Sequence, residues 1–167
     1  GCNPSQVEQI ACDMSPAFIK GIRKSLPKAE ITFDRFHLTK IVNDAVDKVR
    51  RDEASTKIEL KKTRYLWLTN PKNLTPKQLR RLSSLSRQNL QTVRAYNIRL
   101  AFQDFFTQSD RATGESWLKS WYFWATHSRL QPVIDAAKTV KSHWAGVLNW
   151  FHSHITTGIL EGFNSLL

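Results

Sequence analysis

The stretch AEITFDRFHLTK, residues 29–40, decides the fold because it passes from a strand pattern to a helix pattern. Residues 31–33 are apolar or β-branched and predict a short buried strand. This strand runs directly into Asp34, and His37 follows three residues later. An aspartate here is typical of a helix N-cap, because its carboxylate accepts hydrogen bonds from the free backbone N–H groups of the first turn. The stretch therefore predicts a strand that ends at Asp34 and a helix that begins there, with His37 in its first turn.

Upstream of this stretch, the sequence predicts a second strand and a helix. Residues 7–12 (VEQIAC) form a strand pattern, and residues 15–26 (SPAFIKGIRKSL) form a helix pattern. Ser15 and Pro16 are a favourable helix start, since the hydroxyl caps the helix and the proline lacks an N–H that would have no partner there. Strand, helix and strand within about 30 residues make a βαβ unit, whose two strands are parallel neighbours.

Two acidic residues follow these two strands. Asp13 comes after the first strand and Asp34 after the second. Parallel strands end at the same edge of a sheet, and functional groups gather at that edge. The pair therefore predicts a functional corner more strongly than either residue alone.

Residues 36–155 show helical periodicity and no convincing strand pattern. Helical segments are expected at 36–49, 58–68, 74–85, 90–105, 114–127 and 131–154. Their apolar stripes are sufficient for the core of a helical bundle. A last helix is expected to begin around Glu161. The predicted fold class is therefore α+β and mostly α, with a βαβ unit at 1–35, a helical block at 36–155 and the start of a helix at 156–167.

The charge of the chain points to an anionic partner. Among 167 residues, 25 Lys and Arg oppose 14 Asp and Glu, which gives a formal net charge of +11. Nucleic acid is the most economical partner for such an excess. No apolar run approaches the ~20 residues that a membrane-spanning helix needs. Cys2 and Cys12 have no metal-ligand spacing and fit a reducing cytoplasm.

Three segments carry a resemblance to a known family: ACDMSPAFIKGI (11–22), LPKAEITFDRFHLTKIVNDAVDKVRR (26–51) and GILEGFNSLL (158–167). Together they resemble the DDE transposases of bacterial insertion sequences, of the ISL-three type, in order and over essentially the whole chain. The resemblance implies a ribonuclease-H-like catalytic core with a large helical insertion at 36–155. Related Mutator-like and hAT transposases share an Asp, then a Cys-or-Asp–x–x–His pair, which Asp34 and His37 match.

The resemblance also implies roles for the acids. Asp13 matches the second catalytic acid and Glu161 the third. Both would be metal ligands in a site with two Mg²⁺ or Mn²⁺ ions, at which DNA is cut and joined. Carboxylate oxygens suit these hard cations. The first acid of the family lies on a strand upstream of Gly1, so the resemblance implies a fragment that is inactive alone. Asp34 is preferred as a helix cap beside His37, and Asp34 as the metal ligand in place of Asp13 is the alternative.

The expected partner is double-stranded DNA, both the ends of the element and the target, with no membrane. Candidate phosphate contacts are basic pairs, each of which could equally form a hydrated face. Two tryptophans are candidates for stacking on a displaced base. These residues are Arg50, Arg51, Lys61, Lys62, Arg80, Arg81, Trp117 and Trp121.

The resemblance further implies a bacterial cytoplasmic protein associated with the nucleoid, active as a homodimer or a higher oligomer. The competing interpretation is a non-enzymatic, basic helical DNA-binding module whose acids only cap helices. The two differ in whether the carboxylates of Asp13 and Glu161 converge at one sheet edge.

Overall fold

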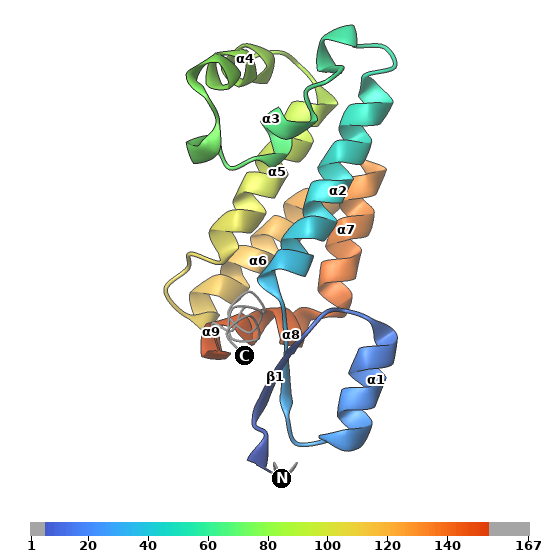
Figure 1. Cartoon of the computed structure of the whole chain (residues 1–167), viewed down its shortest axis with the longest axis vertical. Coiled ribbons are helices and arrows are strands. Elements are labelled where there is room, and N and C mark those ends of the chain that lie inside the picture. The colour runs from blue at the N-terminus through green and yellow to red at the C-terminus, as the bar shows by residue number, and fades with distance from the viewer. Residues whose placement is uncertain (1–5, 154–167) are drawn as a thin grey trace, which may run out of the picture.

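The computed structural model describes residues 6–153 and places a small sheet at one end of a helical bundle (Figure 1). Strand β1 (Gln9–Cys12), helix α1 (Pro16–Ser25) and strand β2 (Glu30–Phe33) form the sheet end. The two strands are parallel, and their register runs from Gln9 opposite Glu30 to Cys12 opposite Phe33. The predicted βαβ unit is therefore confirmed, with a first strand that is shorter than residues 7–12.

The described chain after β2 is helical, as the sequence predicted. Its helices are α2 (Arg35–Glu53), α3 (Arg64–Leu68), α4 (Pro76–Ser86), α5 (Gln91–Phe105), α6 (Arg111–Thr126), α7 (Gln131–Ser142), α8 (Trp144–Leu148) and α9 (Trp150–Ser153), with short 3-10 helices η2 (Ile58–Leu60) and η3 (Pro71–Asn73). Within residues 6–153 none of them is long and apolar enough to cross a bilayer.

The core of the bundle lies between α2, α5, α6 and α7. Helix α2 packs against α5 and α7, and both of these pack against α6. Leu38, Val46 and Phe102 are completely buried at this junction. These apolar residues recur every three or four positions, which places them on one face of each helix and drives the helices together.

Helix α2 is tied to the N-terminus of α5 by a side chain from far along the sequence. Leu90 precedes α5 and offers no capping side chain. Glu53, the last residue of α2, accepts hydrogen bonds from the backbone N–H groups of Gln91 and Thr92, both at 2.8 Å, and from the Thr92 hydroxyl at 2.7 Å. A carboxylate at a helix N-terminus satisfies free N–H groups and is favoured by the helix dipole.

The predicted helix over 58–68 is wrong, because the chain forms η2 and α3 with a turn between them. Lys62 adopts a left-handed backbone conformation in this turn, with φ of 60°. The next residue, Thr63, donates a hydrogen bond to the Leu60 carbonyl and accepts one from Nε1 of the completely buried Trp67. This buried hydrogen-bond chain stabilises the turn in place of a continuous helix.

The single helix predicted over 131–154 is also wrong, because the described part is divided into α7, α8 and α9. The first break falls at His143, where the imidazole Nδ1 donates to the Thr139 carbonyl at 2.9 Å. Beyond this break, α8 packs against β2. Asn149 then donates from Nδ2 to the Ile31 carbonyl at 2.8 Å, and Ser153 lies beside the end of the same strand. The helical block therefore returns to the sheet and covers β2, as Figure 1 shows at the base of the bundle.

Candidate active site

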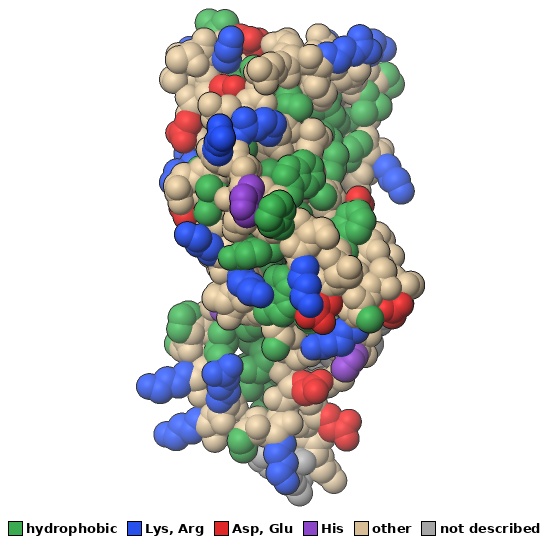
Figure 2. Space-filling view, turned by 180° about the vertical axis from the view of Figure 1, so that it is seen from behind, with side chains coloured by type: hydrophobic (Ala, Val, Ile, Leu, Met, Phe, Trp, Pro, Cys, Tyr) green, Lys and Arg blue, Asp and Glu red, His purple; other side chains and the backbone are tan. Residues whose placement is uncertain are grey.

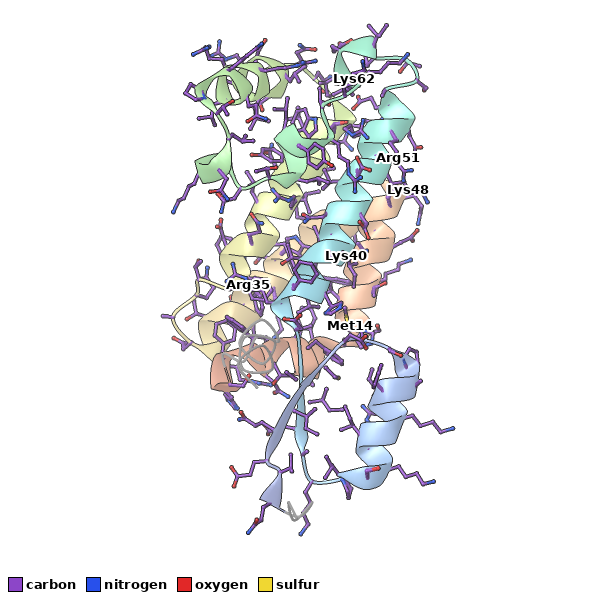
Figure 3. The ribbon with its side chains drawn as sticks, viewed as in Figure 1. Met14, Arg35, Lys40, Lys48, Arg51 and Lys62 are labelled. Atoms are coloured by element: carbon purple, nitrogen blue, oxygen red, sulfur yellow. The ribbon has the colours of Figure 1, made fainter. Side chains whose placement is uncertain are left out.

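The corner that the sequence predicted lies where the sheet meets the bundle. Asp13 and Asp34 directly follow Cys12 and Phe33, the last paired residues of the two strands. The Asp34 backbone N–H donates to the Cys12 carbonyl at 3.2 Å, which extends the pairing to the corner. Figure 3 labels Met14, the residue after Asp13, at this end of the sheet. Asp13 and Asp34 therefore share one sheet edge.

Asp34 caps helix α2, as predicted. Its side chain is 1% exposed, and Oδ1 accepts from the Phe36 backbone N–H at 3.2 Å. Its Oδ2 lies 3.1 Å from His37 Nδ1. Both carboxylate oxygens are therefore engaged within the first turn of α2, and the residue is fixed at the boundary between sheet and helix.

His37 is oriented by this contact. A carboxylate accepts and does not donate, so Nδ1 carries the proton that points to Asp34. The neutral ring then presents Nε2 as a hydrogen-bond acceptor, and the side chain is 41% exposed. The Phe36 ring lies edge-on to the imidazole, with 5.7 Å between ring centroids. The contact therefore fixes which imidazole nitrogen faces Asp34 and leaves Nε2 without this carboxylate.

Asp13 is half-buried and less constrained than Asp34. Its Oδ1 accepts from the Ser15 backbone N–H at 2.9 Å. No hydrogen bond within residues 6–153 reaches its Oδ2, so one oxygen can bind a cation. The neighbouring Cys12 is a poor ligand, because burial and the Asp13 carboxylate raise the pKa of its thiol and keep it protonated.

The acids at the corner have the chemistry for a hard cation, but the described residues do not complete a metal site. Within residues 6–153, no group of three or more His, Cys, Asp or Glu side chains could hold a metal ion. Glu161, the other predicted ligand, lies outside the described residues. Asp13 and Asp34 offer oxygen donors of the kind that Mg²⁺ and Mn²⁺ prefer.

Two of the predicted DNA contacts, Arg50 and Trp121, are buried, contrary to the prediction. Arg50 lies on the core side of α2, where its guanidinium binds Asp47 and the Leu60 carbonyl. Trp121 is buried between helices and donates from Nε1 to the Ile98 carbonyl. Neither side chain can reach a phosphate or a base at the surface.

The other predicted DNA contacts lie at the surface. Trp117 is partly exposed, although its Nε1 donates to the Ala101 carbonyl. Of the predicted basic contacts, Arg51, Lys61, Lys62, Arg80 and Arg81 are exposed. The structure adds Arg64, which the sequence reasoning missed because it is not part of a basic pair, although the spacing KKTR could have indicated it.

An exposed aromatic surface on α6 was also not singled out from the sequence. Phe123 and Trp124 are both exposed, and the His127 ring stacks on Phe123 with 4.0 Å between centroids. Figure 2 shows hydrophobic side chains gathered on this side of the molecule, with Lys and Arg around them. The signal was present in the sequence as the aromatic run within residues 121–124.

A groove lies beside the sheet in the described part of the chain. It has a volume of about 880 Å³ and runs between α1 and α8, with β2 at its base. Ile31, Phe33 and Trp144 contribute apolar surface, and Lys20 and Arg23 stand on α1. Figure 2 shows hydrophobic side chains in this lower hollow with basic residues at its rim. Its lining does not include Asp13, Asp34 or His37.

Comparison with known proteins identifies the class that this architecture belongs to. A family model described as a transposase, of the ISL3 type of DDE transposase, matches residues 2–167. The chain belongs to this family, as the three segments at 11–22, 26–51 and 158–167 had indicated.

Curated relatives include transposases of named insertion sequences. The chain is 28% identical to the transposase of insertion sequence element IS1001 from Bordetella parapertussis, over 97% of this chain and 42% of that protein. It is 24% identical to the transposase of IS1557 from Mycobacterium tuberculosis, over 64% of this chain and 24% of that protein. No solved structure matches the chain. The chain thus spans less than half the length of these relatives.

Proposed function

We propose that this chain forms part of the catalytic core of an insertion-sequence transposase that cuts DNA at the ends of the element and joins them to a target. The observation that carries the proposal is the shared sheet edge of Asp13 and Asp34, in a chain of a DDE transposase family. Divalent Mg²⁺ or Mn²⁺, two ions in the complete site, supplies charge stabilisation for the attacking and departing oxygens of the phosphodiester. This core is proposed to have a ribonuclease-H-like fold.

Asp13 is the proposed metal ligand of the described residues. One of its oxygens is held by Ser15, which fixes the side chain, and the other is available to a cation. Glu161 is proposed as the second ligand from this chain. The first acid of the triad is proposed to come from a preceding segment of the longer protein, so the chain alone should bind Mg²⁺ weakly and should not cleave.

Asp34 and His37 are proposed to form the wall of the site. Asp34 is buried, and its two oxygens are hydrogen-bonded to the Phe36 backbone N–H and to the His37 ring. Its proposed role is therefore to position the imidazole and not to bind metal directly. Nε2 of His37 lies on the side of the ring away from the Asp34 carboxylate, where it can hydrogen-bond to a water or, once protonated, to a phosphate oxygen. The alternative, with Asp34 as the ligand in place of Asp13, requires Asp34 to release the helix cap.

The proposed substrate is double-stranded DNA, bound by exposed basic residues and by Trp117. The net charge of +11 supports this proposal. The protein is proposed to act as a homodimer or higher oligomer on DNA in the bacterial cytoplasm.

The test uses the full-length protein, DNA that carries the ends of the element, and Mg²⁺ or Mn²⁺. Asp13→Asn and Glu161→Gln should abolish strand cleavage and leave DNA binding intact, because each keeps the side-chain shape and removes the charge that holds a cation. Asp34→Asn should be milder, since asparagine caps a helix about as well as aspartate. Asp44→Asn is the matched control, because this exposed acid on α2 pairs with Lys40 and makes no other ion pair within residues 6–153.

The outcomes separate the alternatives. If Asp13→Asn cuts like the unchanged protein while Asp34→Asn is inactive, Asp34 is the metal ligand. If neither these variants nor Glu161→Gln changes cleavage, the metal-site proposal is wrong. A protein that binds DNA and never cuts it, with the complete chain and metal present, is the non-enzymatic DNA-binding module.

A further inference from the structure

Asp47 on α2 collects three arginine side chains. Its own side chain is only 11% exposed. Arg50 binds its Oδ1 through Nη2 at 2.7 Å and Nε at 2.9 Å. The Nε atoms of Arg51 and Arg64 lie 3.5 Å and 3.6 Å from Oδ2. One carboxylate therefore faces three guanidinium groups, and the site keeps an excess of positive charge.

The three arginines are not equivalent. Arg50 is nearly buried and also donates from Nη1 to the Leu60 carbonyl, so its role is structural. Arg51 and Arg64 are 64% and 52% exposed and contact Asp47 only at the outer limit of an ion pair. No hydrogen bond within residues 6–153 uses their terminal N–H groups. These two guanidinium groups are gathered in one place and remain available to a ligand.

Two lysines extend the positive surface. Lys61 and Lys62 are exposed in the turn between η2 and α3, next to Arg64 in the sequence. Figure 3 labels Arg51 and Lys62 at the end of α2 that lies far from the sheet. We call Arg51, Lys61, Lys62 and Arg64, arranged around Asp47, the Asp47 cluster.

We propose that the Asp47 cluster binds the phosphate backbone of duplex DNA at a fixed distance from the corner of Asp13 and Asp34. Guanidinium groups bind phosphate oxygens bidentately, and a central carboxylate that gathers them in advance lowers the entropic cost of binding. The inference rests on the proposed function, because it takes the DNA that is cut at the corner as its ligand.

The helix sets the spacing. Asp34 and Asp47 are 13 positions apart at the start and in the middle of α2. At ~1.5 Å per residue, this is about 20 Å. A duplex that runs alongside α2 advances about 3.4 Å per base pair, so the contacted phosphates lie about six base pairs from the cut.

The first test measures binding of the full-length protein to a random-sequence duplex of about 30 base pairs, by fluorescence anisotropy over a range of salt concentrations. Arg51→Gln/Arg64→Gln should weaken binding about tenfold and lower the salt slope by about two, because two phosphate contacts are lost. Lys24→Gln/Lys28→Gln, at and just after the end of α1, makes the same change of charge with exposed residues that are not among the predicted DNA contacts and should alter both quantities much less. Equal effects of the two double variants would show a general charge effect and overturn the site.

The second test locates the contact. Phosphate ethylation about five to seven base pairs from the cut should interfere with binding of the unchanged protein but not with binding of Arg51→Gln/Arg64→Gln. Interference that is the same in both proteins would overturn the proposal. This double variant and its control should both keep the thermal unfolding midpoint of the unchanged protein. In Arg51→Gln/Arg64→Gln, Arg50 still neutralises Asp47.

The Asp13→Asn variant separates this inference from the proposed function. If Asp13→Asn stops cleavage while Arg51→Gln/Arg64→Gln binds DNA normally, the Asp47 cluster is wrong and the metal-site proposal stands. If Asp13→Asn cuts normally while the double variant binds DNA weakly, the DNA contact stands and the assignment of Asp13 as a metal ligand fails.

Discussion

Gly146→Ala should destabilise the protein, because Gly146 lets helix α8 approach strand β2 closely. A Cβ atom at this position would lie 2.2 Å from Cε2 and 2.4 Å from Cδ2 of the Phe33 ring. These distances are far below van der Waals contact, so the ring or the helix must move. Phe33 is nearly buried, and the His143 ring packs on it edge-on at 4.8 Å between centroids.

The size of the effect follows from two opposing contributions. Overpacking of a buried contact costs about 1–3 kcal/mol. Alanine is favoured over glycine in a helix by about 1 kcal/mol, which offsets part of this cost. Because the Cβ would lie so close to two atoms of a rigid ring, the overpacking cost falls in the upper part of its range, about 2–3 kcal/mol. We expect a net loss of about 1–2 kcal/mol in the free energy of unfolding, and a decrease of about 2–8 °C in the thermal midpoint. Because Phe33 directly precedes Asp34, the substitution should also reduce DNA cleavage by the full-length protein.

Gly21→Ala is the matched control. Gly21 lies on the exposed part of α1, and a Cβ atom there has no heavy atom within 4 Å. This substitution should stabilise the protein by about 0.5–1 kcal/mol, which is the reverse of the effect at Gly146. Both variants can be compared by urea and thermal unfolding, followed by far-UV circular dichroism.

A smaller side chain at position 33 should rescue Gly146→Ala. Phe33→Leu removes the ring atoms that the new methyl group meets, so Gly146→Ala should cost less in the Phe33→Leu background than alone. If Gly146→Ala is as stable as the unchanged protein, or if Phe33→Leu does not reduce its cost, close approach at Gly146 does not hold α8 on β2.

Further predictions concern helix caps. Asp34→Ala should lose about 1 kcal/mol of stability in urea unfolding and leave His37 without its carboxylate partner. Asp34→Asn should lose less, and equal losses would contradict the capping role. Glu53→Ala should lose about 2 kcal/mol of stability, because three hydrogen bonds to the start of α5 disappear. The amide of Thr92 should then exchange faster with solvent, and unchanged exchange would contradict the capping of α5 by Glu53. Asp110 is the N-cap of α6. The backbone N–H of Thr113 and nearby hydroxyls lower the pKa of Asp110, so its stabilisation is present above the unfolded-state pKa of about 4 and is lost as the pH falls. The stability difference between the unchanged protein and Asp110→Ala should therefore shrink in acid, and a difference that stays constant down to about pH 2 would contradict this capping role.

The sequence alone determined several local elements and some of their caps, although the Ser15 side chain makes no capping hydrogen bond at the start of α1, contrary to the prediction. The change from strand to helix at Asp34 follows from neighbouring residues, as does the start of α4, where Thr75 and Gln78 form a capping box. The parallel pairing of β1 and β2 follows from the length of the connection between them. These features depend on interactions over a few positions, so patterns of adjacent residues were sufficient to predict them.

The exposure of the basic and aromatic residues was only partly readable from the sequence. Arg50 lies four positions after the completely buried Val46, so helical spacing could have indicated that it faces the core while Arg51 faces solvent. Trp121 lies three positions after Leu118 and on the same buried face. Pairs of adjacent basic residues were considered as units, although neighbours in a helix point in directions about 100° apart.

Only the tertiary structure decided where distant segments meet. Glu53 caps α5 by accepting from Gln91 and Thr92, which follow it in the sequence by 38 and 39 positions. Gly146 in α8 lies close to Phe33 in β2, and Arg51 and Arg64 meet at a shared carboxylate, that of Asp47. Periodicity gives the apolar face of each helix but not the surface that it packs against. The relative placement of the helices is set by the mutual packing of side chains that are remote in sequence, and that packing also determines which charges remain in solvent.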